Sequence, residues 1–305
     1  DPNKIDIVGD KSDPEASNLP LDETNTLITP TIPLKTVAGV AVSFNIELRT
    51  TNKNLRRNSW FDKPEDNISI DFAQNGKSDQ ISYVLSKGDV KGRYVVAVTS
   101  KIAYTETTPN VITVSINKVK VTSVQPKLIV KPDVPATVVV SDINGKKADL
   151  AAANIDGVYI AFFLASDQFG NEVTLSAENS LNLAIDIATE TYLFTKEYMN
   201  GVMKVVFQPK KPGQLTYTFD SLKTSFKVVL LQGSISRANS FFTIAAKTGT
   251  TIVAGTEAQV EFHPKDKWDN ELVLDTKYPD VNLMQLQLLL KDPSATTFSV
   301  VDAKH

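Results

Sequence analysis

A run of alternating apolar and polar residues leads three times into a short polar corner, and this recurrence limits the possible folds more than any other feature. The corner reads DQFGN at Asp167 to Asn171 and DKWDN at Asp266 to Asn270, with a weaker copy, TTNKN, at Thr50 to Asn54. Apolar residues stand eight, six and four positions before the first residue of each corner. Since successive side chains of a strand point to opposite faces, this spacing predicts a strand with one buried face running into each corner.

A second landmark repeats downstream of the corners. GRYVVAVTSK from Gly92 aligns with GVMKVVFQPK from Gly201, and the second copy continues into a turn at Pro212 and Gly213 and another alternating strand. The two glycines lie 109 residues apart, between the corner spacings of 117 and 99 residues. Two landmarks with a shared period of this length predict tandem sandwiches of the immunoglobulin size, about 100 residues each.

These motifs resemble the filamin-type immunoglobulin-like repeat, in which an alternating strand enters an Asp-x-x-Gly-Asn corner and a later glycine-led strand precedes a Pro-Gly turn. The resemblance covers most of residues 24–305. It is good in the second copy, partial in the first, where Thr50 replaces the aspartate, and confined to the front half of the third. It implies an all-β fold of tandem immunoglobulin-like (filamin-type) β-sandwich domains in a rod. The residues that mark the repeat are Asp167, Gly170, Asn171, Gly92 and Gly201.

The repeat divides the chain into four segments. Residues 1–23 carry seven acidic and two basic residues with little alternation, which is typical of a linker or arm. Residues 24–118 and 119–232 are predicted to form the first two domains, and residues 233–305 a third, truncated domain. Within residues 119–232 we assign KLIVKP, residues 127–132, to the joint and the first strands of the second domain.

Charge and cysteine content exclude several classes of function. The net charge is -3 and the basic residues are scattered, so we expect no binding to nucleic acid or to an anionic membrane surface. The absence of cysteine excludes disulfides, thiolate catalysis and cysteine-ligated metals. Because the chain begins at Asp1, we expect it to be a piece of a larger protein, with any membrane anchor outside this fragment.

The corners offer oxygen ligands, but a turn accounts for most of their residues. Aspartate and asparagine side chains accept hydrogen bonds from turn amides, and Gly170 allows a positive φ. In the third corner Asp269 replaces the glycine and adds a carboxylate. Asp266, Asp269 and Asn270 are therefore the candidate calcium site, and we predict no other metal and no cofactor.

Aromatic residues and one sequon are the remaining candidates for recognition or modification. Phe169 and Trp268 stand in the middle of their corners, where we expect each to cap the core of its own sandwich. Trp60 and Phe61 lie outside the repeat pattern and are candidates for a loop-borne contact with a partner. Asn67 begins an acceptor sequon, Asn-Ile-Ser, for N-glycosylation.

The chain carries no recognised catalytic motif. Its two histidines, His263 and His305, cannot be placed beside a nucleophile and a carboxylate, and serine-hydrolase, zinc-protease and phosphate-loop signatures do not occur. We therefore predict that the protein is not an enzyme.

Three functions remain open at this point. The first is an extracellular or cell-surface adhesion fragment that binds a protein partner, as in filamin-related repeats of large surface proteins, including gamete adhesion molecules of plants and protists. The second is a cytoplasmic filamin-like rod that crosslinks actin, and the third is a carbohydrate-binding accessory module. In the filamin family the edge strand after the corner is the usual docking strand. On this chain the resemblance implies that the partner-binding residues are Glu172, Val173, Thr174 and Leu175.

Overall fold

The computed structural model describes residues 21–51, 55, 61, 63–74, 79–122, 125–178, 181–187, 190–246 and 258–273. The chain divides into two compact units. The first comprises residues 1–139, 163–180 and 200–202, and the second comprises residues 140–162, 181–199 and 203–305.

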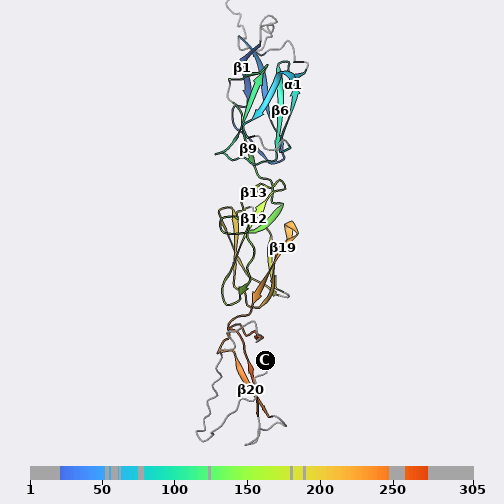
Figure 1. Cartoon of the computed structure of the whole chain (residues 1–305). Coiled ribbons are helices and arrows are strands. Elements are labelled where there is room, and N and C mark those ends of the chain that lie inside the picture. The colour runs from blue at the N-terminus through green and yellow to red at the C-terminus, as the bar shows by residue number, and fades with distance from the viewer. Residues whose placement is uncertain are drawn as a thin grey trace, which may run out of the picture. The chain divides into compact units, whose positions relative to one another are not determined.

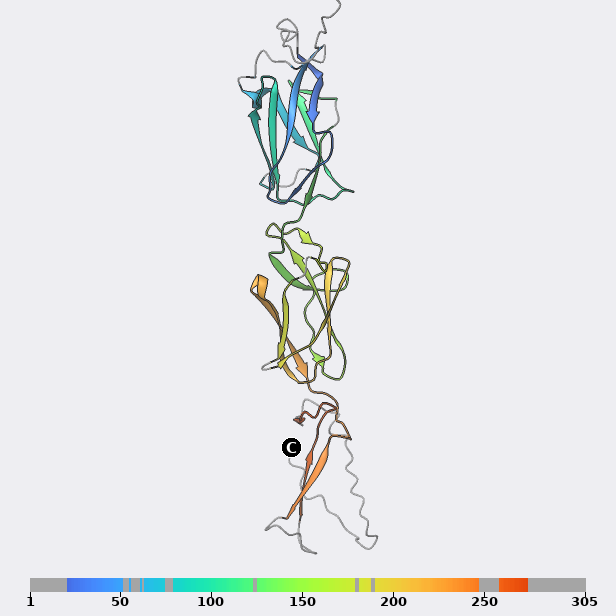
Figure 2. The ribbon, with the colours of Figure 1, turned by 180° about the vertical axis from the view of Figure 1, so that it is seen from behind.

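The first sandwich consists of two sheets that face each other (Figures 1 and 2). One sheet has the order β1–β3–β6–β5, with bounds Leu21–Thr29, Val42–Thr50, Arg93–Ser100 and Ile81–Lys87. The other has the order β2–β9–β7–β4, with bounds Leu34–Val37, Lys127–Lys131, Asn110–Ile116 and Ile68–Phe72. The short strand β8 (Val119–Lys120) pairs with β7, and the helical turn α1 (Pro64–Asn67) precedes β4. This two-layer strand order is that of an immunoglobulin-like sandwich.

Alternation in the sequence becomes the two faces of each strand in this sandwich. Along β6 every second residue is buried, and Tyr94, Val96 and Val98 are fully inaccessible to solvent. Phe44 and Ile46 of β3 lie in the same core. The inward positions predicted before the first corner therefore belong to the core of the first sandwich.

The second sandwich repeats this arrangement. One sheet has the order β10–β12–β17–β16, with bounds Thr137–Ser141, Tyr159–Ser166, Val202–Phe207 and Thr195–Met199, and β13 (Glu172–Val173) pairs with β12. The other has the order β11–β19–β18–β14–β15, with bounds Ala153–Asn154, Thr224–Leu231, Gly213–Phe219, Leu183–Ile187 and Glu190–Thr191. A short 3₁₀ turn, Asp220–Leu222, connects β18 to β19. The rings of Tyr159, Phe207 and Tyr217 gather in its core, with centroids 5.7 to 6.4 Å apart.

An antiparallel hairpin follows the second sandwich. It consists of β20 (Phe241–Ala246) and β21 (Ala258–His263), and the rings of Phe242 and Phe262 lie 4.9 Å apart across it. The third corner comes directly after β21. The side chains of Ala258 and Val260, which we predicted to point inward, and the chain after Val273 lie outside the described residues.

The strand pairing corrects two predicted boundaries. We placed the end of the first domain at residue 118 and assigned residues 127–132 to the joint and the second domain. In the structure β9 pairs in parallel with β2 and antiparallel with β7, so it belongs to the first sandwich. The physical reason is that the backbone groups of β9 bond to β2 on one side and to β7 on the other. β1 begins at Leu21 and pairs with β3 from that residue, so the first sandwich also starts before the predicted end of the arm at residue 23. The rod arrangement and the boundary at residue 232 stay predictions.

Removal of a large core side chain should destabilise the first sandwich severely. Phe44 is 1% exposed, so Phe44→Ala leaves a cavity and should lower the free energy of unfolding by about 3–5 kcal/mol. The matched control is Val84→Ala on β5, where the side chain is 67% exposed and the loss should stay below about 1 kcal/mol. Urea denaturation followed by circular dichroism measures both. Equal losses in the two variants would contradict the assigned core.

Candidate interaction site

The second corner is held by one buried carboxylate. Asp167 is 2% exposed, and its Oδ1 accepts hydrogen bonds from the backbone N–H groups of Phe169 and Asn171, both at 2.9 Å. Its Oδ2 accepts the side-chain amide of Asn171 at 2.8 Å and the backbone N–H of Asp133 at 3.0 Å. Gly170 has a φ of +87°, which agrees with the expected role of glycine at this position. Both oxygens of Asp167 are thus used to build the turn.

These bonds also set the protonation of Asp167. Burial raises the pKa of its carboxyl group, but the hydrogen bonds from Asn171, Asp133 and Phe169 outweigh burial, so the pKa lies below its ordinary value of 3.8. The folded corner therefore favours the charged carboxylate.

The third corner repeats this geometry. Asp266 is fully buried, and its Oδ1 accepts the backbone N–H groups of Trp268 at 2.8 Å and Asn270 at 3.0 Å. Its Oδ2 accepts the side-chain amide of Asn270 at 2.8 Å. Asp269 occupies the glycine position with a φ of +69°, and its carboxylate bonds the ammonium of Lys265 at 3.1 Å. The candidate calcium ligands are therefore already hydrogen-bonded within the corner. Calcium binding there is untested, and these bonds compete with it.

Asn171 and Phe169 also contact the first sandwich, within the first unit. The side chain of Asn171 donates to the carbonyl of Lys101 at 2.8 Å and accepts the N–H of Ala103 at 2.9 Å. Phe169 packs against the hydrophobic core of the first sandwich. Its ring covers Gly39, where an added Cβ would lie 2.7 Å from the ring. The expectation that Phe169 caps its own core is wrong, because it covers the end of the preceding core.

The third corner makes the corresponding contacts within the second unit. Asn270 donates to the carbonyl of Lys210 at 2.7 Å, and the indole N–H of Trp268 donates to the carbonyl of Ile155 at 3.4 Å. The ammonium of Lys210 lies 5.6 Å from the centre of the Trp268 ring, within the range of a cation–π interaction. Both aromatic corners thus contact the sandwich that precedes them in the chain.

The glycines that mark the second landmark also adopt the left-handed region. Gly92 has a φ of +85° and Gly201 a φ of +80°, each at the turn into the strand of its repeat. An L-residue rarely adopts this conformation, which is a physical reason for glycine at both positions.

The predicted partner-binding residues occupy different environments. Phe61 is half-buried against the first core, with its ring 6.0 Å from that of Tyr94 and its backbone N–H donated to the Tyr94 hydroxyl at 2.5 Å. Trp60 lies outside the described residues. Asn67 closes α1 and donates its side-chain amide to Asn117 at 2.9 Å. Partner binding by Trp60 and Phe61 and glycosylation at Asn67 stay predictions.

The edge strand after the second corner is shorter than we expected. Only Glu172 and Val173 are in a strand, β13, which pairs with the end of β12. Val173 and Leu175 are 4% and 2% exposed, and the backbone N–H of Leu175 donates to Gly201 at 3.0 Å. Glu172 and Thr174 are exposed. Docking on these four residues stays a prediction, and Val173 is unsuitable for testing it because a change there would disturb the core.

An edge that sequence analysis did not single out is β5. It pairs with β6 and with no other described strand. The carbonyl of Gln80 accepts the N–H of Lys101, and the N–H of Gly88 is donated to Arg93, so the even-numbered residues bond to β6. Antiparallel pairing alternates, and the backbone groups of Tyr83 and Leu85 therefore face away from the sheet.

The side chains of β5 make this edge apolar. Tyr83 is 41% and Val84 67% exposed, while Leu85 packs on the first core. The Tyr83 ring lies 6.2 Å from that of Phe72 on β4, the edge strand of the facing sheet. An edge with outward backbone groups and apolar side chains is a template for strand addition. Its edge position depends on strand order, which the local sequence ISYVLSK does not carry.

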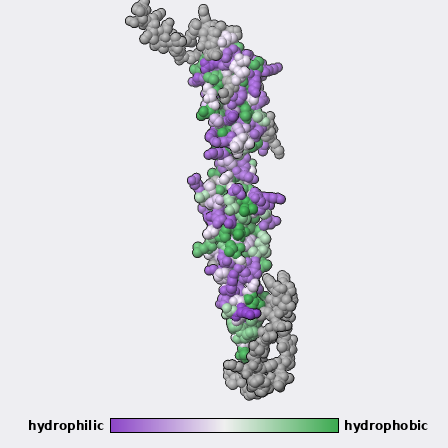
Figure 3. Space-filling view, turned by 90° about the vertical axis from the view of Figure 1, so that its left-hand side faces the viewer, coloured by the Kyte–Doolittle hydropathy of each residue, from purple (hydrophilic) through white to green (hydrophobic). Residues whose placement is uncertain are grey.

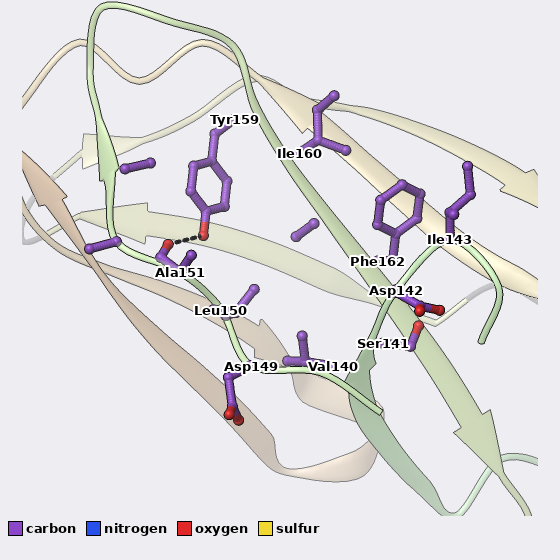
Figure 4. A pocket seen from close by; sticks show the side chains of 13 residues that line it. Val140, Ser141, Asp142, Ile143, Asp149, Leu150, Ala151, Tyr159, Ile160 and Phe162 are labelled. Carbon is purple, nitrogen blue, oxygen red and sulfur yellow. Dashed lines mark hydrogen bonds between the residues drawn. The ribbon is translucent and has the colours of Figure 1, made fainter. Parts of the chain in front are cut away.

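A second apolar surface is a groove of about 530 Å³ on the second sandwich (Figure 4). Ile143, Ile160 and Phe162 lie on one side of it, and Tyr159 donates its hydroxyl to the carbonyl of Ala151 at 2.9 Å. Figure 3 shows hydrophobic side chains gathered on one face of this sandwich. The groove lies beside a turn at residues 142–145, where the N–H of Gly145 donates to the carbonyl of Asp142 at 3.1 Å.

The described residues contain no group of three or more histidine, aspartate or glutamate side chains that could hold a metal ion. Within the same residues no helix is both long and apolar enough to span a bilayer.

Comparison with known proteins gives likenesses of fold. No family model and no curated protein matches the chain. It is similar to the structure of FdeC, an Escherichia coli adhesin, with 19% identity over 82% of this chain and 76% of that one, at a TM-score of 0.48. For invasin, a bacterial integrin-binding protein, the identity is 13% over 79% of this chain and 48% of that one, with a TM-score of 0.44. The filamin domain of Lin-41 is 7% identical over 36% of this chain and 96% of that one, with a TM-score of 0.28.

At these identities and TM-scores the likenesses identify no partner and no activity for this chain. The strand order of the described sheets agrees with the prediction of an all-β chain of tandem immunoglobulin-like sandwiches.

Calcium should leave the stability of the third corner unchanged. The oxygens of Asp266 accept N–H groups, and Asp269 pairs with Lys265, so few ligands remain for a cation that takes six to eight oxygens. We expect the same melting temperature with added calcium and with a chelator, both for the wild type and for Asp269→Asn. A rise in melting temperature with calcium that Asp269→Asn abolishes would show a cation site.

The second corner should be a source of acid sensitivity. Since the pKa of Asp167 is depressed in the folded state, its contribution to stability is complete above 3.8 and is lost as the pH falls through the folded value. Asp167→Asn should be less stable at neutral pH and lose less further stability in acid than the wild type. Thermal unfolding across this pH range measures the effect, with the exposed Glu172→Gln as control. Parallel losses in wild type and Asp167→Asn would contradict this assignment.

Proposed function

We propose that the chain is a non-enzymatic recognition segment of a surface adhesin, in which the β5 edge of the first sandwich binds an extended segment of a protein partner. The observation that carries the proposal is the edge of β5, which pairs on one side only among the described strands, with Tyr83 and Val84 exposed beside outward backbone groups. The resemblance of the repeats to those of large surface proteins supports an extracellular location.

The partner segment should be extended and should alternate apolar and polar side chains. Its backbone would bond the outward N–H and C=O groups of Tyr83 and Leu85, which gives affinity without reading sequence. Its apolar side chains would lie on Tyr83, whose exposed ring adjoins the buried ring of Phe72 of β4.

Strand addition predicts a distinct difference between proline and alanine at Tyr83. Proline removes an N–H that faces the partner and leaves the bonds of β5 to β6 in place, as expected at a sheet edge. Alanine removes the ring and keeps the N–H. The probes are linear peptides, selected from a displayed library for binding to the immobilised chain. Tyr83→Pro should weaken the binding of these peptides about tenfold more than Tyr83→Ala does. Isothermal titration calorimetry with the selected peptides measures both.

Hydrogen exchange provides the control for location. The selected peptides should protect the backbone amides of Tyr83 and Leu85, and circular dichroism should show both variants folded. Peptides that protect other strands, or that bind Tyr83→Pro as tightly as Tyr83→Ala, would exclude strand addition at β5.

A further inference from the structure

The contacts of the two aromatic corners repeat at matching positions of the preceding sandwich. The carbonyl that accepts the amide of Asn171 belongs to Lys101, nine residues after Gly92. The carbonyl that accepts the amide of Asn270 belongs to Lys210, nine residues after Gly201. Since these glycines are the aligned landmarks of the repeat, both asparagines bind the same position of a sandwich.

The aromatic side of each corner also meets a matching position. Phe169 covers Gly39, which lies 11 residues before Thr50, the start of the first corner. Lys267, next to Trp268, donates to the carbonyl of Asp156 at 2.5 Å, and Asp156 lies 11 residues before Asp167. Each corner therefore contacts the turn that precedes the strand leading into the previous corner.

These two positions adjoin in each sandwich. Gly39 donates its N–H to the carbonyl of Ser100 at 2.8 Å, which brings the turn beside Lys101. Gln208 donates its side-chain amide to the carbonyl of Ile155 at 3.2 Å, which brings the equivalent turn beside the segment that follows β17 and contains Lys210. The turn and the strand end together form one surface.

The two contacts differ in several hydrogen bonds, and the sequence explains two of the differences. The residue two positions after Lys101 is Ala103, whose N–H bonds Asn171, but the residue two positions after Lys210 is Pro212. Proline has no backbone N–H to donate. The indole N–H of Trp268, which phenylalanine lacks, supplies a bond to Ile155 in the third corner.

We propose that the corner sequence Asp-x-aromatic-x-Asn is a docking module whose partner is the end of an immunoglobulin-like sandwich of this same repeat. The buried aspartate holds the turn and orients the asparagine. The asparagine amide bonds the backbone after the glycine-led strand, and the aromatic ring covers the turn before the corner strand. The corner is thus an interaction surface as well as a turn.

Hydrogen exchange of the Ala103 amide in the full chain tests the proposal. In Asn171→Ala and in Phe169→Ala this amide should exchange about tenfold faster, because its bond to Asn171 is lost or loosened. The control is Gln168→Ala in the same corner, whose exposed side chain bonds only Asp133 among the described residues and should leave the Ala103 amide unchanged. The amides of Phe169 and Asn171, which bond Asp167, report whether the turn itself is intact.

A double-mutant cycle separates docking from backbone strain. Gly39 has a φ of +80°, so Gly39→Ala is strained in any background, but only the wild type adds a clash with the Phe169 ring. Gly39→Ala should therefore accelerate exchange at Ala103 less when Phe169 is already alanine. Additive effects of the two changes, or unaltered Ala103 exchange in Asn171→Ala with an intact turn, would overturn the proposal.

Discussion

The buried carboxylate of each aromatic corner is the constraint on which the neighbouring structure depends. A carboxylate that is 2% exposed, as at Asp167, is stable only if hydrogen bonds replace the lost water. Four N–H groups do so, and one of them belongs to the side chain of Asn171. That bond leaves the second hydrogen of the amide and its oxygen directed at the backbone of the first sandwich. The demand of one buried charge for donors thus fixes the orientation of the group that makes the next contact.

The sequence predicts the features of the fold that repeat. Alternation before the corners identifies the inward faces of β3 and β12, because a strand's two faces are encoded at a spacing of two residues. The positive φ of Gly170 follows from a turn that only glycine, or an aspartate such as Asp269, adopts readily. These are local properties, and each can be derived from a few neighbouring residues.

Pairing between distant segments could not be derived in the same way. The run at residues 127–132 has the composition of any short strand, and its place in the first sandwich depends on β2 and β7. The local sequence pattern around Phe169 does not decide whether its ring covers the core of its own sandwich or of another. The sequence around Gly39 likewise does not indicate that a ring covers this glycine. The edge position of β5 likewise results from the order of four strands. The sequence does carry one signal of these contacts. Lys101 and Lys210, whose carbonyl groups accept the amides of the corner asparagines, stand at the same position of the repeat.

The first corner shows what the aspartate contributes to the turn. It has Thr50 in place of the aspartate, and Thr50 is fully buried and paired with Leu21 of β1. The strand therefore continues in its sheet to the position where β12 has already given way to the turn of Asp167. A threonine hydroxyl cannot accept three or four N–H groups at once, whereas two carboxylate oxygens can. The substitution of one acceptor type by another thus decides whether this position extends a strand or begins a turn that presents side chains to a neighbouring sandwich.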